Sequence, residues 1–250
     1  ITRPMSLPRV ILLAAGQGSR LGPLAANRPK ALMPVAGEPL ILRTLRQFHE
    51  AGFQDITVVI GHMRDAMESA LIGADNKPTI IINDHYATDT NIGSLLCGLQ
   101  EYDTPALVFE ADIACDTTAI NKISQASTSN GSAWFSTGPF RHYPHGGCLR
   151  ADEGGRLTDL RYVAKNGPAF ADYMKLLGAV YVGPREMPRF HHLLKEAASL
   201  STAQYYMMPW CEHLAELPAI NCDLSDCKTA TFNTPEEYQR CLAQFTTATI

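Results

Sequence analysis

Long apolar runs and an excess of positive charge are both missing from this sequence. No stretch of its 250 residues approaches the roughly 20 consecutive apolar side chains that a membrane-spanning helix needs. Lysine and arginine together number 21, against 25 aspartate and glutamate residues, which gives a net charge of -4 at pH 7. A nucleic-acid partner usually requires a basic face that neutralises phosphates. The sequence therefore predicts neither a membrane nor a nucleic acid as partner, and any bound phosphate must be held by local groups and a metal ion.

Paired cysteine motifs are missing as well. The seven cysteines are an odd number without a C-x-x-C pair, which suits neither a disulfide framework nor a zinc site. We therefore expect reduced thiols and a cytoplasmic protein. The chain begins at Ile1, which indicates a trimmed start or a piece of a longer polypeptide. Ile1–Pro8 has no basic region followed by an apolar stretch, so the sequence predicts no secretion signal. The cysteines are Cys97, Cys115, Cys148, Cys211, Cys222, Cys227 and Cys241.

Short apolar runs alternate with longer amphipathic stretches in the first half of the chain. This pattern is typical of an α/β fold, in which helices pack on a mostly parallel sheet. Continuous apolar runs predict strands that are covered on both faces. The predicted strands are Val10–Ala15, Ile56–Ile60, Thr79–Ile82 and Ala106–Phe109. Three helices are predicted: one that begins at Pro39, one at Met63–Ile72 and one at Ile92–Leu99.

The second half is less regular, with predicted strands on either side of the turn at Glu153-Gly154-Gly155. At this length we expect one domain over residues 1–250, with a nucleotide-binding half at about 8–130 and an acceptor-binding half at about 131–250. The predicted strands are Ser132–Ser136, Cys148–Ala151, Leu157–Val163, Leu177–Val182 and Thr229–Phe232. The predicted helices are Pro188–Ala198, Ala203–Leu214 and one that opens at Pro235.

A glycine-rich loop, Gly16-Gln17-Gly18-Ser19-Arg20, directly follows the first strand. Small residues let backbone N–H groups approach a polyphosphate, and Arg20 adds charge and a fork of donors. A purely structural tight turn is the plainer interpretation. A dinucleotide-binding loop would need a third glycine and an acidic residue at the end of the second strand, and a Walker A loop would need Gly-Lys-Ser/Thr. Neither pattern is present.

The loop continues into Pro29-Lys30 and then into Gly37-Glu38-Pro39-Leu40-Ile41. Together these segments resemble the nucleotidyltransferases that activate sugar phosphates, phosphocholine and aminoethylphosphonate. The resemblance implies a Rossmann-like three-layer α/β/α sandwich with a mostly parallel mixed sheet, of the nucleotide-diphospho-sugar transferase type. It also implies that Arg20 and Lys30 act on the reacting phosphates, although most lysines are simply solvated surface charges. The residues that it implies bind the nucleotide are Leu13, Ala14, Ala15, Gly16, Gly18, Ser19 and Arg20.

Asp112 follows the fourth predicted strand, at the edge where an open α/β sheet binds ligands. Its carboxylate suits Mg²⁺, which prefers oxygen ligands and bridges substrate phosphates. The alternative is a cap for the following segment, and Glu110 and Asp116 are weaker metal candidates. The resemblance implies a second ligand just before a Thr-Pro-Glu helix start, which here is Asn233. Asn233 could instead only cap that helix. We expect Mg²⁺ on Asp112 and Asn233.

The segment after the third strand contains Tyr86, Thr90-Asn91 and Ser94-Leu95. It resembles phosphocholine and phosphonate cytidylyltransferases more than the sugar enzymes, which favours CTP and assigns Asn91 and Ser94 to the nucleotide site. Without the resemblance it is a loop and a helix start, with Thr90 or Asn91 as the N-cap.

The acceptor site is expected in the second half. Tyr205 and Tyr206 are followed by methionines where phosphocholine enzymes have acidic residues. A helix stripe of aromatic residues and methionines is also typical of a hydrophobic core. Scattered positive charge in this half favours an anionic acceptor without a quaternary amine, although such residues usually belong to the solvated surface. The predicted acceptor residues are Arg141, His142, Lys165, Tyr205 and Tyr206, and His145 adds to the positive charge.

The reaction that these residues predict is attack of an acceptor oxygen on the α-phosphorus of CTP, with pyrophosphate as the leaving group. An acceptor phosphate with a second pKa of about 6 is ionised at neutral pH, so no general base is needed. The alternatives are a sugar-1-phosphate nucleotidyltransferase that uses UTP, GTP or dTTP, a molybdopterin-type enzyme and a non-catalytic nucleotide-sensing subunit. A dehydrogenase ranks last. The oligomeric state stays open, with a homodimer among the options.

Overall fold

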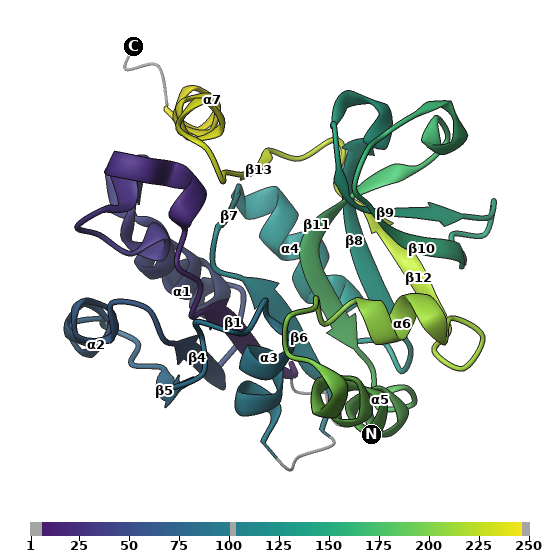
Figure 1. Ribbon diagram of the computed structural model, residues 1–250, viewed down its shortest axis with the longest axis horizontal. Coiled ribbons are helices and arrows are strands. Elements are labelled where there is room, and N and C mark those ends of the chain that lie inside the picture. The colour runs from purple at the N-terminus through teal and green to yellow at the C-terminus, as the bar shows by residue number, and fades with distance from the viewer. Residues whose placement is uncertain (1–6, 101–103, 247–250) are drawn as a thin grey trace.

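A mixed β-sheet runs through the centre of the molecule (Figure 1). The structure is a computed structural model that describes residues 7–100 and 104–246. Its main strand order is β10-β9-β11-β6-β1-β4-β5, and β8 joins β11 to β12. The strands of this sheet within the described residues are β1 (Arg9–Ala14), β4 (Ile56–Ile60), β5 (Thr79–Ile82), β6 (Ala106–Glu110), β8 (Ser132–Pro139), β9 (Gly146–Ala151), β10 (Leu157–Val163), β11 (Met174–Val182) and β12 (Ala219–Asp223).

Strands β1, β4 and β6 are parallel neighbours at the buried centre of the sheet. Val10 of β1 pairs with Ile56 of β4 and with Leu107 of β6. Because successive side chains of a strand point to opposite faces, Val10 and Ile11 belong to two different core clusters. Helices cover both faces, which confirms the three-layer α/β/α sandwich and the mostly parallel mixed sheet. One face carries α1 (Leu40–Glu50), α2 (Arg64–Ile72) and α4 (Thr117–Ala126), and the other carries α3 (Ile92–Leu99) and α5 (Met187–Leu200).

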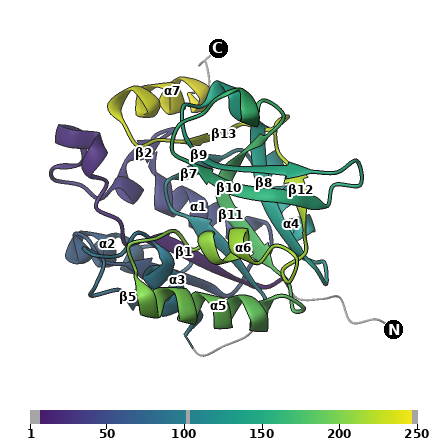
Figure 2. The same cartoon turned by 45° about the vertical axis from the view of Figure 1, so that its right-hand side comes forward.

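The C-terminal segment returns to the region that follows β1. Strand β13 (Thr229–Thr231) pairs with β7 (Ile113–Cys115), and α7 (Pro235–Phe245) then packs against the segment that contains the short helix η1 (Ser19–Ala25), as Figure 2 also shows. The hydroxyl of Tyr238 on α7 donates to the Pro34 carbonyl at 2.7 Å. Tyr238 and Phe232 share a small buried cluster with Leu21. This packing brings Asn233, just before α7, to the residues that follow the first strand.

Most of the predicted strands and helices are confirmed, with shifted ends. The predicted helix Ala203–Leu214 is wrong, because only α6 (Met208–Glu212) is helical. The backbone N–H of Tyr206 donates to Asn91 Oδ1 at 2.8 Å and so does not join a helical ladder. The predicted strand Thr229–Phe232 ends one residue early, because its pairing with β7 stops at Thr231, opposite Ile113. Phe232 is then buried in the cluster under α7.

Several elements were not predicted. They are α4, β7, β12, the hairpin of β2 (Pro34–Val35) and β3 (Glu38–Pro39), and four short 3-10 helices: η1, η2 (Lys30–Leu32), η3 (Phe140–His142) and η4 (Pro168–Phe170). Asp116 caps α4, since its side chain accepts from the Ala119 N–H at 2.8 Å. Across residues 7–100 and 104–246, no helix combines the length and apolar character needed to cross a membrane.

The side chain that makes the capping bonds at the start of α3 is neither of the two predicted. Asn91 occupies the N-cap position, but its side chain makes no capping bond, and Thr90 makes none either. Asp89 performs this role: its carboxylate accepts from the backbone N–H groups of Gly93 at 2.9 Å and Ser94 at 2.7 Å, and from the Ser94 hydroxyl at 2.7 Å. The amide of Asn83 donates to the same carboxylate at 2.9 Å. The prediction that Asn91 is the N-cap residue is therefore confirmed for its position, but the side chain that makes the capping bonds belongs to Asp89.

We expect Asp89→Ala to lower the free energy of unfolding by about 1–2 kcal/mol, because the first turn of α3 loses its acceptor. Thr90→Ala is the matched control and should change it by less than about 0.5 kcal/mol, since Thr90 is exposed. Urea unfolding followed by far-UV circular dichroism measures both. Equal stability of the two variants would contradict the capping role of Asp89.

Candidate active site

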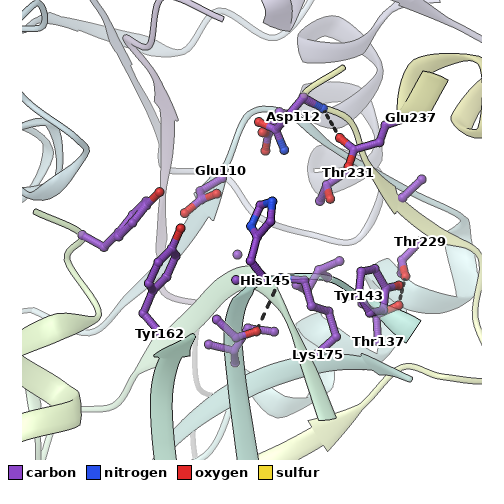
Figure 3. A pocket seen from close by; sticks show the side chains of 18 of the residues that line it. Glu110, Asp112, Thr137, Tyr143, His145, Tyr162, Lys175, Thr229, Thr231 and Glu237 are labelled. Carbon is purple, nitrogen blue, oxygen red and sulfur yellow. Dashed lines mark hydrogen bonds between the residues drawn. The ribbon is translucent and has the colours of Figure 1, made fainter. Parts of the chain in front are cut away.

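A cavity of about 380 Å³ opens where β6 ends (Figure 3). Its walls come from both halves of the chain. They include the end of β6, the start of β9, β11, the segment before α6 and the connection from β13 to α7. The carboxyl ends of parallel strands are the usual ligand-binding edge of an open α/β sheet. The cavity therefore lies at the edge where the sequence predicts the active groups.

Lys30, Asp112, Asn233 and Arg20 meet in one polar cluster. The Lys30 ammonium forms a short ion pair with Asp112 Oδ2 and donates to Asn233 Oδ1 at 2.9 Å. Arg20 Nη2 donates to the same Asn233 oxygen at 2.9 Å. The Lys30 ammonium also lies 5.5 Å from the centre of the Phe232 ring. The structure thus brings together all four residues that the sequence assigns to phosphate and metal binding, although they come from three distant segments.

The oxygens of Asp112 and Asn233 fit the predicted metal. Asp112 Oδ1 is buried and has no hydrogen-bond partner in the described part of the chain. Asp112 Oδ2 and Asn233 Oδ1 already converge on one cation, the Lys30 ammonium. Residues 7–100 and 104–246 contain no group of three or more His, Cys, Asp or Glu side chains that could hold a metal. Mg²⁺ needs no such cage, because it binds one or two protein oxygens and keeps waters and substrate phosphates as its other ligands.

The glycine loop lies against Lys30. Gly18 has φ 63°, a conformation that favours glycine, and a Cβ there would lie 3.2 Å from Lys30 Cβ. Gly16, Ser19 and Arg20 are exposed, so the loop presents backbone and guanidinium groups to solvent. Of the loop residues, only Arg20 lines the cavity itself. The predicted residues Leu13, Ala14 and Ala15 are buried below the loop.

Asn91 holds two walls of the cavity together. Its Nδ2 donates to Glu110 Oε1 at 3.2 Å, and its Oδ1 accepts from the Tyr206 N–H at 2.8 Å. Ser94, the other residue predicted for the nucleotide site, is buried and bonds to Asp89 and Asn83. It does not line the cavity. Asn91 and Ser94 therefore hold the segment after β5 in place through bonds to other protein groups.

Glu110 is an acidic residue of the cavity that the sequence ranked low as a metal ligand. Burial, with a smaller contribution from the charge of Asp112, raises the pKa of Glu110 to about 8, while Lys30 and Lys175 oppose that shift. The carboxylate lies against Gly178, which has φ 90°, and a Cβ at Gly178 would lie 2.9 Å from Glu110 Oε2. Glycine at this position therefore leaves room for the Glu110 head group.

Lys175 is a cavity residue that the sequence analysis missed. Its ammonium donates to the Gly147 carbonyl at 3.4 Å and lies 5.6 Å from the centre of the Tyr143 ring. Burial lowers the pKa of Lys175, and the charge of Glu110 opposes this effect. The signal that could have identified it is a lysine inside the otherwise apolar strand Met174–Val182.

Aromatic side chains form much of the remaining wall. The rings of Tyr162 and Tyr205 stack at 4.8 Å between centroids, and those of Trp134 and Tyr206 stack at 6.1 Å. Tyr206 and Trp134 are almost completely buried, whereas Tyr162 is exposed. The predicted acceptor residues Tyr205, Tyr206 and His142 all line the cavity, as does His145. Arg141 and Lys165 are exposed and lie outside its lining.

Comparisons with known proteins agree with this architecture. The model of the MobA-like NTP transferase domain matches residues 10–173. The CMP-5'-(3-aminopropyl)phosphonate synthase of Streptomyces rubellomurinus is 33% identical over 159 residues, which are 62% of this chain and 25% of that protein. The choline-phosphate cytidylyltransferase of Streptococcus pneumoniae is 33% identical over 104 residues, 42% of this chain and 44% of that protein. The chain thus matches less than half the length of each of these curated relatives.

A solved structure extends the likeness to the second half of the chain. The CTP:phosphocholine cytidylyltransferase from Streptococcus pneumoniae superposes with a TM-score of 0.79 and covers 95% of this chain and 99% of that one. The identity is 20%, so this match establishes the fold alone.

The bridging role of Asn91 yields a stability prediction. Asn91→Ala should lower the free energy of unfolding by about 1–3 kcal/mol, because Glu110 and the Tyr206 N–H both lose a partner. The control is Asn130→Ala, which should change the free energy of unfolding little, because Asn130 is exposed in the turn before β8. Urea unfolding measures the difference. If Asn91→Ala proved as stable as Asn130→Ala, the bridge would contribute nothing.

Proposed function

We propose that this chain, which belongs to the MobA-like NTP transferase domain family, transfers CMP from CTP to a small phosphonate or phosphate acceptor and releases pyrophosphate. The observation that carries the proposal is the convergence of Arg20, Lys30, Asp112 and Asn233 beside one cavity. Cations and oxygens that could bind a metal ion, placed beside a cavity, suit the meeting of a polyphosphate with a second substrate.

CTP is the proposed nucleotide because two relatives with 33% identity are named as a CMP-phosphonate synthase and a cytidylyltransferase. The segment Thr90-Asn91-Ile92-Gly93-Ser94, which resembles cytidylyltransferases, lies at the start of α3 beside the cavity wall. Asn91 and Ser94 would act on the nucleotide by positioning this segment, since their side chains bond to protein groups.

The proposed reaction is an in-line displacement. An oxygen of the ionised acceptor forms a bond to the α-phosphorus of CTP, the bond from that phosphorus to the β-phosphate oxygen breaks, and pyrophosphate leaves. Arg20 and Lys30 donate to phosphate oxygens as charge shifts toward the leaving group, which stabilises the transition state. Asp112 and Asn233 would hold Mg²⁺, which supplies further neutralisation of phosphate charge. No general base is required, because an acceptor with a second pKa of about 6 is ionised at neutral pH.

The tail of the acceptor would occupy the cavity, and we assign it an amine. The Glu110 carboxylate lies in a wall that also carries Tyr162, Tyr205 and Tyr206. A bound ammonium favours the charged form of such a carboxyl group and is also attracted by ring faces. An aminoalkyl phosphonate fits this wall, and the name of the Streptomyces relative contains a compound of that class.

Pyrophosphate release over a substrate grid tests the proposal. CTP, UTP, GTP and dTTP are each combined with phosphocholine, 2-aminoethylphosphonate and hexose 1-phosphates in the presence of Mg²⁺. We expect kcat/KM with CTP and an amine-bearing acceptor to exceed every other pair by at least about tenfold, about 1.4 kcal/mol in the barrier. A best rate with UTP, GTP or dTTP and a hexose 1-phosphate would instead identify a sugar-nucleotide enzyme. Nucleotide binding without turnover would identify a nucleotide sensor.

Lys30→Met and Asp112→Asn should have opposite effects on metal binding. In the absence of nucleotide, Asp112→Asn should weaken Mn²⁺ binding, because it removes the carboxylate. Lys30→Met should strengthen it, because the ammonium no longer competes for the oxygens of Asp112 and Asn233. Electron paramagnetic resonance of free Mn²⁺ measures both. Both variants should lower kcat on the order of 10²–10³-fold.

The control for this pair is Lys122→Met, which breaks a surface contact with Asp226, and neither residue lines the cavity. It should change neither Mn²⁺ binding nor kcat. Unaltered Mn²⁺ binding and near-normal turnover in Asp112→Asn would remove Asp112 from the proposed site.

A further inference from the structure

The cavity contains an acidic and a basic side chain that do not pair with each other. Glu110 and Lys175 both line it. Within the described residues, no carboxylate oxygen lies within the 4.0 Å ion-pair distance of the Lys175 ammonium, whose hydrogen-bond partner is the Gly147 carbonyl at 3.4 Å. Glu110 receives a bond from the Asn91 amide and none from a cation. An acid and a base that share one cavity without a mutual ion pair leave both groups able to contact a ligand.

Two glycines with left-handed backbone make space for these head groups. Gly146 has φ 123°, and a Cβ there would lie 2.7 Å from Lys175 Nζ. Gly178 has φ 90°, and a Cβ there would lie 2.9 Å from Glu110 Oε2. Any other residue at either position would strain the backbone and displace the charged group. Glycine at these two positions therefore leaves room for the Lys175 ammonium and the Glu110 carboxyl group in the cavity wall.

An ammonium that is mostly removed from water is costly unless an anion accompanies it. Two other lysines have one: Lys30 pairs with Asp112, and Lys122 pairs with Asp226. Lys175 has a backbone carbonyl and the face of the Tyr143 ring, neither of which carries a full negative charge. A substrate that carried only an amine would add a second cation to this cavity. A substrate that also carried an acid group would supply the missing counter-ion.

We propose that the acceptor is an amino acid with a terminal phosphonate or phosphate group, whose ammonium contacts Glu110 and whose carboxylate contacts Lys175. This inference rests on the proposed function, because it specifies the tail of the same acceptor. The phosphonate or phosphate end lies toward Arg20, Lys30 and Asp112. The ammonium of the tail lies beside Glu110, and its carboxylate lies beside Lys175. Lys175 then determines specificity and takes no part in the bond changes at phosphorus.

Three acceptors that differ by one group each test the proposal with CTP and Mg²⁺. They are 2-amino-3-phosphonopropionate, 2-aminoethylphosphonate, which lacks the carboxylate, and 3-phosphonopropionate, which lacks the amine. We expect kcat/KM of the unaltered chain for the first to exceed the other two by tenfold or more. The difference should appear mainly in KM, because the tail groups are remote from the reacting phosphorus.

Lys175→Met should reduce the ratio of kcat/KM for 2-amino-3-phosphonopropionate to that for 2-aminoethylphosphonate by tenfold or more. Lys122→Met, which alters a lysine outside the cavity lining, should leave this ratio as it is. Thermal unfolding checks that Lys175→Met is folded. If Lys175→Met is not folded, Lys175→Gln is used in its place. The comparison of the three acceptors on the unaltered chain does not depend on either variant.

The outcomes separate this inference from the function on which it rests. A best rate with 2-aminoethylphosphonate, or a ratio that Lys175→Met does not change, would overturn the amino-acid acceptor and leave the cytidylyltransferase intact. Equal rates with 3-phosphonopropionate and its amino derivative would overturn the role of Glu110. No turnover of CTP with any of the three acceptors or with phosphocholine would overturn the proposed function itself.

Discussion

The Lys30 ammonium is the contact on which the whole site depends. It joins Asp112, at the end of β6, to Asn233, just before α7, and lies against the glycine loop. Asn233 reaches this point only because α7 packs on the region after β1 through a buried cluster that includes Tyr238. Sheet order, C-terminal packing and the proposed phosphate site are therefore coupled, and loss of the α7 contact would separate the proposed metal ligands.

The charges around the cavity fall into two kinds. Lys30 and Arg20 bond to the protein's own oxygens, which a polyphosphate could replace, and under the proposed function Asp112 and Asn233 would then be free to hold Mg²⁺. Glu110 and Lys175 have only neutral partners within hydrogen-bond reach, so a substrate can satisfy both without breaking an ion pair. The first kind suits the shared chemistry of nucleotidyl transfer, and the second suits selection of one acceptor.

The sequence predicted the features that local patterns determine. Apolar runs identified β1, β4, β5 and β6, and contiguous motifs identified Lys30, Asp112 and Asn233 as residues that should meet. It could not predict the bridge from Asn91 to Glu110 and Tyr206, because this bridge depends on how α3 and the segment before α6 pack across the sheet. The same bridge explains why the helix predicted from Ala203 begins only at Met208. Lys175 was missed because a lysine in an apolar strand does not by itself show that its ammonium lies in a cavity without a carboxylate partner among the described residues, which depends on how the strands and loops pack.

Phosphorus NMR of the complete reaction tests the central claim most directly. The chain is mixed with CTP, Mg²⁺ and 2-amino-3-phosphonopropionate, and the phosphorus signals are followed with time. Our account predicts that the free phosphonate signal declines while pyrophosphate appears, and that two new coupled signals report a phosphonate–phosphate anhydride in equal amount. Release of inorganic phosphate from CTP with an unchanged phosphonate signal, or no change at all, would contradict it.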